Sequence, residues 1–147
     1  MSGEAAPTQG LIDTNIVIQL VAVDPDYLPD EMVISAVTLA ELSAGPQYAQ
    51  DPAERARRMS VLQHTEATFD PLPFDAGAAR AYGLVCAAVL AAGRKPRGRM
   101  ADLMIAAVAM ANDLPLHTAN PDAFAGLESL LRVVAVRRRP RRPEIQH

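Results

Sequence analysis

The 147-residue chain contains one cysteine, no tryptophan, three Phe and three Tyr. The single cysteine, Cys86, excludes a disulfide within the chain and is typical of a protein kept in a reducing cytoplasm. Because Cys86 lies among small apolar residues, we expect a buried and inert thiol. With so few aromatic side chains, Ala, Val, Leu and Ile must fill the interior of a single domain of this length.

Long hydrophobic runs and common phosphate-binding motifs are also absent. The stretch 81–93 carries no charge but is too short to span a bilayer, and the first residues lack the basic and apolar regions of a signal peptide. We therefore expect a cytoplasmic protein with no membrane segment. Gly-x-x-x-x-Gly-Lys, Gly-x-Ser-x-Gly and Gly-x-Gly-x-x-Gly do not occur, which argues against a P-loop, a hydrolase elbow and a dinucleotide site.

Charge is distributed unevenly along the chain. Residues 1–131 carry eight Lys and Arg against sixteen Asp and Glu, whereas residues 132–147 carry six Arg and one Glu. The body of the protein is therefore acidic and its end is basic, although the net charge is only −3. This asymmetry predicts that the basic end contacts an anionic partner.

Short apolar runs alternate with helical segments throughout the chain. Strands are predicted to end near Ile12, Ser35, Phe74, Thr118 and Val136. Helices are predicted at 16–21, from 38, over 52–69, from 75 to 93 and over 100–109. This order predicts an α/β domain over residues 1–136, with a mainly parallel sheet and helices on both faces, followed by a flexible basic tail over residues 137–147.

The first apolar run ends at Asp13, and apolar residues resume after Thr14 and Asn15. Asp13 is thus expected at the carboxyl end of a strand, the edge where open α/β sheets build ligand sites. Thr14 or Asn15 would then cap the following helix. The alternative is that Asp13 itself serves only as the helix cap.

Other acids occupy comparable positions. Glu41 follows the second strand, three residues after Thr38, so a capping-box partner is the alternative reading. Asp102 lies in the first turn of a very apolar helix, just after the basic loop 94–99, where an acid also suits the helix dipole. Asn120 and Asp122 lie in the loop after the fourth strand.

Carboxylates at neighbouring strand ends, with no Cys/His cluster beside them, favour Mg²⁺ or Mn²⁺ over zinc. Two unit charges ~4 Å apart repel by about 4 kcal/mol at an effective dielectric near 20, so gathered acids call for a cation. A hard divalent ion at such a site promotes phosphodiester hydrolysis. We interpret His64 and the arginines of helix 52–69 as solvated surface, and His117 as a satisfied structural histidine.

Four segments in this order resemble a PIN domain, and more narrowly the VapC toxins of bacterial toxin–antitoxin pairs. They are Leu11–Asn15 (LIDTN), Thr38–Leu42 (TLAEL), Arg99–Ala106 (RMADLMIA) and Thr118–Asp122 (TANPD). The resemblance extends over residues 8–136. It implies a three-layer α/β/α fold and a Mg²⁺- or Mn²⁺-dependent endoribonuclease that cleaves structured RNA, such as tRNA or rRNA, by metal-activated water. It also implies a homodimer and a VapB-type antitoxin that blocks the acidic site.

The resemblance assigns roles to individual residues. Asp13, Glu41 and Asp102 become the core metal-binding and catalytic acids, Asn120 a further ligand and Asp122 the fourth acid. The chain departs from the family pattern at Ala123, where many relatives carry an acid.

Basic residues are predicted to bind RNA: Arg97 and Arg99 in the basic loop, and Arg137, Arg138 and Arg139 in the tail. For the tail, an acidic antitoxin or a merely solubilising role are the alternatives. For the whole protein, the main alternative is a non-catalytic assembly module whose acids only cap helices. A phosphatase with Asp13 as nucleophile is disfavoured, because Asn15 stands where its general acid would be.

Overall fold

Four parallel strands form the sheet of this computed structural model, which describes residues 8–140. β1 (Gln9–Ile12) and β3 (Leu116–Thr118) lie in the centre, with β2 (Glu31–Val33) beside β1 and β4 (Val133–Ala135) beside β3. All three neighbouring pairs are parallel. The expected parallel sheet is confirmed.

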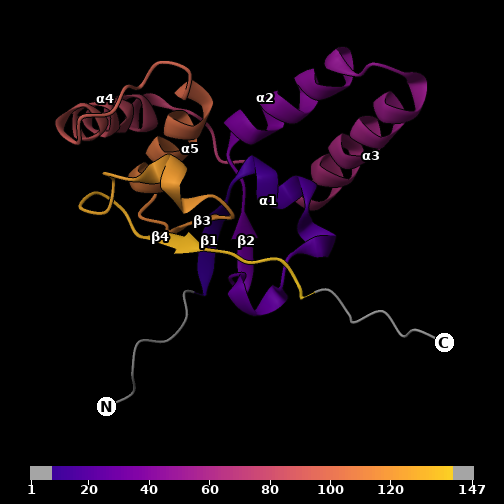
Figure 1. Cartoon of the computed structure of the whole chain (residues 1–147), viewed down its shortest axis with the longest axis horizontal. Helices are drawn as coiled ribbons and strands as arrows, with labels where there is room; N and C mark the ends of the chain where they lie inside the picture. Colours follow the sequence, from indigo (N-terminus) through magenta and orange to yellow (C-terminus); the bar gives the residue numbers. More distant parts are fainter. Residues whose placement is uncertain (1–7, 141–147) are drawn as a thin grey trace.

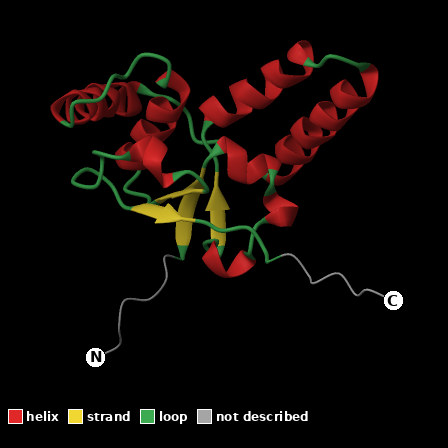
Figure 2. Cartoon of the chain, in the orientation of Figure 1, coloured by secondary structure: helices red, strands yellow, loops and turns green. Residues whose placement is uncertain are grey.

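Five α-helices and four short 3₁₀ helices connect these strands within residues 8–140. The α-helices are α1 (Thr14–Ile18), α2 (Ala36–Ala44), α3 (Pro52–Thr68), α4 (Ala76–Ala91) and α5 (Met100–Ala111). The 3₁₀ helices are η1 (Leu20–Ala22), η2 (Pro25–Tyr27), η3 (Gly45–Tyr48) and η4 (Pro121–Phe124). Figures 1 and 2 show α4 and α5 side by side on one side of the molecule, and the α2–α3 pair projecting on the other.

Each face of the sheet has its own hydrophobic core. Successive residues of a strand point to opposite faces, so Leu11 and Ile12 enter different cores. Leu11 packs with α4, α5 and β3 residues, whereas Ile12 packs with a cluster that includes Ile16 and Leu42 of α1 and α2. Helices therefore cover both faces of the sheet, and the predicted three-layer arrangement is confirmed.

Side chains at the ends of strands and loops start the helices. The carboxylate of Asp13 accepts a hydrogen bond from the Ile16 N–H, so the prediction that Thr14 or Asn15 caps α1 is wrong. Ser35 caps α2 through the Val37 N–H, one turn earlier than Thr38. Because α2 begins at residue 36, Glu41 lies beyond the first turn and cannot act as a capping-box partner.

The strand predicted to end near Phe74 is reduced to a single bridge. Leu72 pairs in parallel with Ser35 beyond the end of β2, accepting from the Ala36 N–H and donating to the Ile34 carbonyl. The neighbouring segment turns into α2 at Ala36, so no extended backbone remains there for residues after Leu72 to pair with.

The imidazole ring of His117 in β3 packs closely against Gly10 of β1. A Cβ placed on Gly10 would lie 2.3 Å from Cε1 of His117. His117 is buried, as expected for a structural histidine, but its Nδ1 has no hydrogen-bond partner within residues 8–140. Burial, and then the charge of Arg132, lowers the pKa of His117, which keeps the ring neutral in the core.

We expect Gly10→Ala to lower the free energy of unfolding by about 1–3 kcal/mol, because the added methyl group overpacks the contact with His117. Gly83→Ala is the matched control: Gly83 lies inside α4 with nothing within 4 Å of an added Cβ. It should stabilise the protein by up to about 1 kcal/mol through helix propensity. Urea unfolding measures both, and equal stability of wild type and Gly10→Ala would contradict the close approach.

Candidate active site

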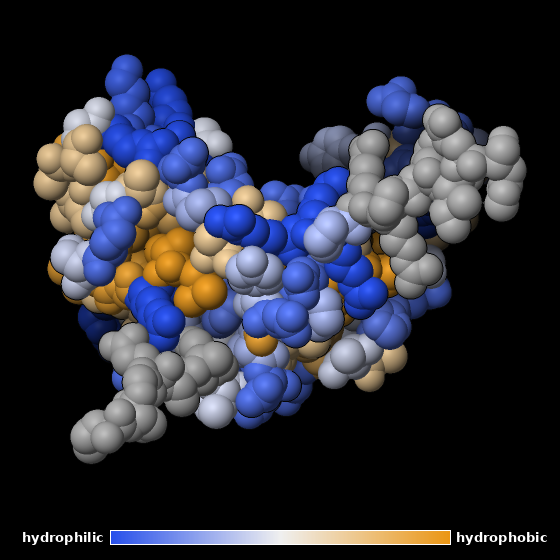
Figure 3. Space-filling model, turned by 60° about the horizontal axis from the view of Figure 1, so that its bottom comes forward, coloured by the Kyte–Doolittle hydropathy of each residue, from blue (hydrophilic) through white to orange (hydrophobic). Residues whose placement is uncertain are grey.

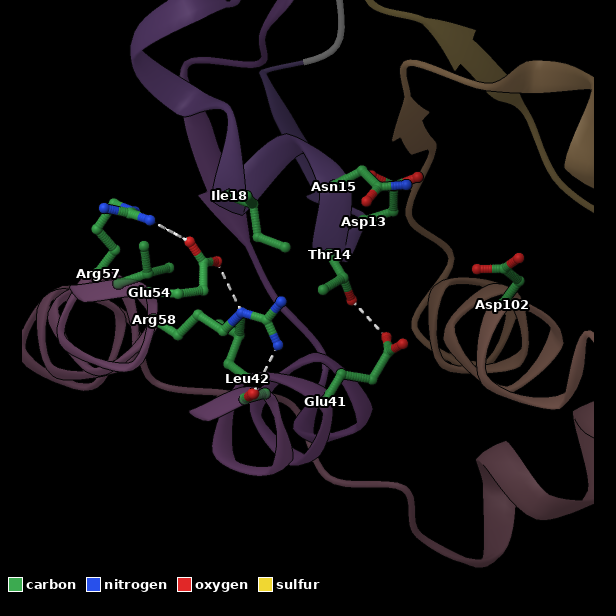
Figure 4. A pocket seen from close by; sticks show the side chains of 12 residues that line it. Asp13, Thr14, Asn15, Ile18, Glu41, Leu42, Glu54, Arg57, Arg58 and Asp102 are labelled. Carbon is green, nitrogen blue, oxygen red and sulfur yellow. Dashed lines mark hydrogen bonds and ion pairs between the residues drawn. The ribbon is translucent and has the colours of Figure 1, made fainter. Parts of the chain in front are cut away.

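A cavity of about 580 Å³ opens beside the carboxyl end of β1, between α1, α2, α3 and α5 (Figure 4). Its lining includes the carboxylates of Asp13, Glu41 and Asp102, which come from three different elements. It also includes Glu54, Arg57 and Arg58 of α3. The cavity therefore has an acidic side and a side that carries both charges.

Asp13 is at once a helix cap and part of the cavity wall. It is 5% exposed; one carboxylate oxygen accepts from the Ile16 N–H at 3.1 Å and the other from the Thr118 hydroxyl at 2.5 Å. Burial raises the pKa of Asp13, the two hydrogen bonds counteract it, and the charge of Asp102 adds a smaller upward contribution. The capping and functional readings of Asp13 therefore do not exclude each other.

Two threonine hydroxyls orient Glu41. The Thr14 hydroxyl donates to the Glu41 carboxylate at 2.6 Å, and its oxygen lies 3.0 Å from the Thr38 hydroxyl oxygen. Since Thr14 has one proton to give, Thr38 must donate to Thr14. In Figure 4 the Thr14 and Glu41 side chains point toward each other. From the sequence, these threonines were predicted only as possible helix caps or capping-box residues. The available signal for their role was that each lies close to a candidate acid: Thr14 follows Asp13, and Thr38 stands three residues before Glu41.

Asp102 has a different environment. It lies half-buried in the first turn of α5, and its carboxylate makes no hydrogen bond or ion pair with any of residues 8–140. The residue at the cap position, Arg99, makes no side-chain cap bond either. Burial raises the pKa of Asp102, while the charge of Arg99 lowers it by a smaller amount. A helix-capping bond therefore does not account for Asp102.

Asn120 and Asp122 are not among the residues that line the cavity. The Asn120 N–H donates to the hydroxyl of Thr118, the residue that holds Asp13. Asp122 is exposed in η4, and its backbone carbonyl accepts from the Arg94 guanidinium at 2.7 Å. The structure thus brings together three of the five predicted oxygen ligands and leaves these two outside the cavity.

The basic loop bonds to η4 rather than to the cavity. Arg99 donates to the Ala123 carbonyl at 3.3 Å, as Arg94 does to the carbonyl of Asp122. Arg97 is exposed, and neither Arg97 nor Arg99 lines the cavity. Their contact with RNA stays a prediction.

The first residues of the basic tail pair with the segment that follows α1. Arg138 forms an antiparallel bridge with Val23, and its guanidinium donates to the side-chain oxygen of Gln19. The Arg137 carbonyl and the Arg139 N–H bond to the backbone of residues 24 and 22. Residues 141–147 lie outside the described residues. The arginines 137–139 therefore lie on the surface beside η1. Their contact with RNA stays a prediction.

The donor set of the cavity suits a hard cation. All three acids offer oxygen, and Asp102 has no competing partner within residues 8–140. As the side chains stand, however, no three His, Cys, Asp or Glu side chains in this part of the chain are close enough together to hold a metal ion. The residue types fit Mg²⁺ or Mn²⁺, and ligation would require the acids to move closer.

Several known proteins are similar to this chain in sequence and fold. The family described as PIN domain matches residues 10–128. Ribonuclease VapC5 of Mycobacterium tuberculosis is 35% identical over 134 residues, which are 89% of this chain and 96% of that protein. The crystal structure of VapBC-5 from M. tuberculosis matches with a TM-score of 0.78 and 34% identity, over 88% of this chain and 99% of that one. DNA-bound VapBC from Salmonella typhimurium matches with a TM-score of 0.67 and 25% identity, over 88% and 98% of the respective chains.

We expect Asp102→Asn to raise the melting temperature of the metal-free protein at neutral pH. Burial in the folded state raises the pKa of Asp102 above 3.8, so the cost of its charge to folding develops as the pH rises from 3.8 to the folded pKa and is fully present above it. Below pH 3.8 both states bind the proton, and the difference from wild type should vanish. Thermal unfolding between pH 3 and pH 8 measures this.

Asp122→Asn is the matched control, because Asp122 also occupies a first-turn position but is exposed and outside the cavity. It should show no such pH-dependent gain. If Asp102→Asn is less stable than wild type at neutral pH, the residue acts as a helix-stabilising acid instead.

Proposed function

This chain belongs to the PIN-domain family and, within it, to the group of the VapC ribonucleases, and on that premise we propose that it is the endoribonuclease toxin of a toxin–antitoxin pair. One observation supports this most directly: Asp13, Glu41 and Asp102, from three separate elements, line one cavity at a sheet edge. Ligand sites of open α/β sheets lie at this edge.

The proposed cofactor is Mg²⁺ or Mn²⁺, held by these three acids. The ion would supply the activation of water and the stabilisation of the leaving oxygen that phosphodiester hydrolysis needs. The chain's own residues prepare the site: Thr118 and the Ile16 N–H fix Asp13, and the Thr38–Thr14 hydroxyl pair fixes Glu41. Asp102 is the carboxylate available to orient the attacking water, in preference to the exposed Asp122.

The proposed substrate is structured RNA such as tRNA or rRNA, cut in an unpaired segment. Proteins that select RNA by sequence mostly read bases in loops and bulges, because the major groove of an RNA helix is too narrow for side chains. The cavity volume of about 580 Å³ lies in the range of small-ligand pockets, so the cavity suits part of an unpaired strand better than a duplex.

The proposed partners are a VapB-type antitoxin and a second copy of the chain. VapBC complexes are among the structures similar to this chain, which supports the first. For the second, Leu84 and Leu90 of α4 and Met100 of α5 are exposed large apolar residues. Figure 3 shows apolar surface on the left side of the molecule, where α4, α5 and β4 lie in Figure 1. We propose that the dimer partner covers this α4–α5 surface.

Brief expression of the wild type in bacterial cells should create new RNA 5′ ends at one or a few recurrent positions, detected by sequencing. Asp13→Ala should abolish these new ends, because it removes one of the three proposed metal ligands. Purified protein should cleave the same RNA with Mg²⁺ or Mn²⁺ and not with EDTA, and Asp13→Ala should lower the rate by at least about 100-fold. Identical 5′ ends from wild type and Asp13→Ala would refute the proposed activity.

The antitoxin should inhibit by placing an arginine in the acidic side of the cavity, because a guanidinium binds two carboxylates at once. Its replacement by Ala in the partner should weaken inhibition, and excess Mn²⁺ should relieve inhibition of the unmodified complex. Cleavage assays on the purified complex measure both. Inhibition that survives replacement of every partner arginine near the cavity would contradict this mode.

A further inference from the structure

The wall of the cavity opposite the three acids carries Glu54, Arg57 and Arg58 of α3. In Figure 4 these side chains stand across the cavity from Asp102, with Thr14 and Glu41 between them. Glu54 accepts hydrogen bonds from both arginines. This group therefore has a net charge of +1 and faces three carboxylates.

Two hydrogen bonds hold the Arg58 guanidinium in place and leave its other N–H groups free. Its Nε donates to Glu54 at 2.9 Å and its Nη1 to the Gly45 carbonyl at 2.8 Å. A guanidinium has five N–H groups, so three N–H groups of Arg58 have no partner within residues 8–140. Figure 4 shows the free edge of this guanidinium directed toward the middle of the cavity. The Arg58 side chain is 40% exposed, which leaves it accessible to a ligand.

Arg57 also uses only two of its five N–H groups, but it lacks a contact like that of Arg58 with Gly45 and is more exposed. Its Nε and Nη2 both donate to Glu54, and its side chain is 66% exposed. Both bonds go to the same oxygen of Glu54, so within residues 8–140 no residue outside α3 fixes the Arg57 guanidinium by a hydrogen bond. Of the two arginines, Arg58 is the one whose free donors and position suit a ligand inside the cavity.

We infer that Arg58 binds a backbone phosphate of the RNA, adjacent to the bond that Asp13, Glu41 and Asp102 face. The inference rests on the proposed ribonuclease function. An RNA strand that enters a cavity lined by four carboxylates is repelled, and a guanidinium on the opposite wall offsets this repulsion. Because Glu54 and Gly45 already fix Arg58, binding costs little additional side-chain entropy.

The surface between the two walls suits the nucleotide that this phosphate belongs to. Ile18, Leu42 and Val61 line the cavity beside Arg58, and Ile18 is 53% exposed. Apolar side chains give an unstacked base a contact surface without competing for its phosphate. Arg58 and these residues together form a subsite for one unpaired nucleotide.

Salt dependence of RNA binding tests the inference. Fluorescence anisotropy with a short, labelled, single-stranded RNA of mixed sequence is measured between low and moderate salt, with Asp102→Asn in every protein to prevent cleavage. Arg58→Gln should weaken binding several-fold and reduce the slope of log K against log salt by about 0.7, the value for one lost phosphate contact. Arg58→Lys should keep the slope, because the lysine still neutralises a phosphate.

Arg55→Gln is the matched control. Arg55 lies on the same helix and is exposed, but it does not line the cavity. Its replacement removes the same charge and should leave the slope and the cleavage rate unchanged. With Asp102 restored, Arg58→Gln should raise KM for RNA cleavage more than it lowers kcat, because binding of the phosphate precedes the chemical step.

The outcomes separate the inference from the proposed function. If wild type neither binds nor cleaves RNA, the proposed function is wrong and the inference falls with it. If wild type cleaves RNA but Arg58→Gln behaves as Arg55→Gln, only the inference is overturned. A lower melting temperature of Arg58→Gln with an unchanged salt slope also overturns it, and shows that Arg58 merely joins α3 to Gly45.

Discussion

The structure around the cavity depends on the burial of one carboxylate, that of Asp13. Its two oxygens connect three elements: the residue follows β1, one oxygen caps α1 and the other accepts from Thr118 at the end of β3. Burial of an acid opposes its ionisation, and the two hydrogen bonds offset only part of that cost. A cation beside Asp13 would remove the remaining cost, so the same arrangement that strains the metal-free protein favours metal binding.

The cavity is built from two opposed sets of charges. One side suits a cation and consists of the acids Asp13, Glu41 and Asp102. The other side suits an anion and consists of Arg58, which Glu54 and the Gly45 carbonyl hold in place. The proposed metal-assisted RNA hydrolysis would use both, because the reacting phosphate is negative and the proposed metal ion is positive. The α2–α3 pair contributes to both sides, since Glu41 lies on α2 and Arg58 on α3. Under the proposed function, the α2–α3 pair that projects in Figure 1 serves both the cation and the RNA.

Sequence reasoning predicted the fold and the acids of the cavity, but not how the acids are supported. Apolar runs that end at a single Asp or lead into an acid are local signals, and they located Asp13, Glu41 and Asp102 on the right elements. The Thr118 contact with Asp13 joins residues 105 positions apart, and no local pattern encodes it. Arg58 was read as solvated surface, because helical spacing cannot reveal that the Gly45 carbonyl and a cavity lie across from it. The predicted strand near Leu72 shrank to one bridge, because pairing at an edge depends on which neighbour is present.

The central claim is that Asp13, Glu41 and Asp102 converge on one divalent cation. A crystal structure of the protein soaked with Mn²⁺, with data collected at the manganese absorption edge, tests this most directly. We expect an anomalous peak in the cavity, within ligating distance of carboxylate oxygens from all three residues. A peak at another position, or none in crystals of a protein that cleaves RNA with Mn²⁺ in solution, would contradict it.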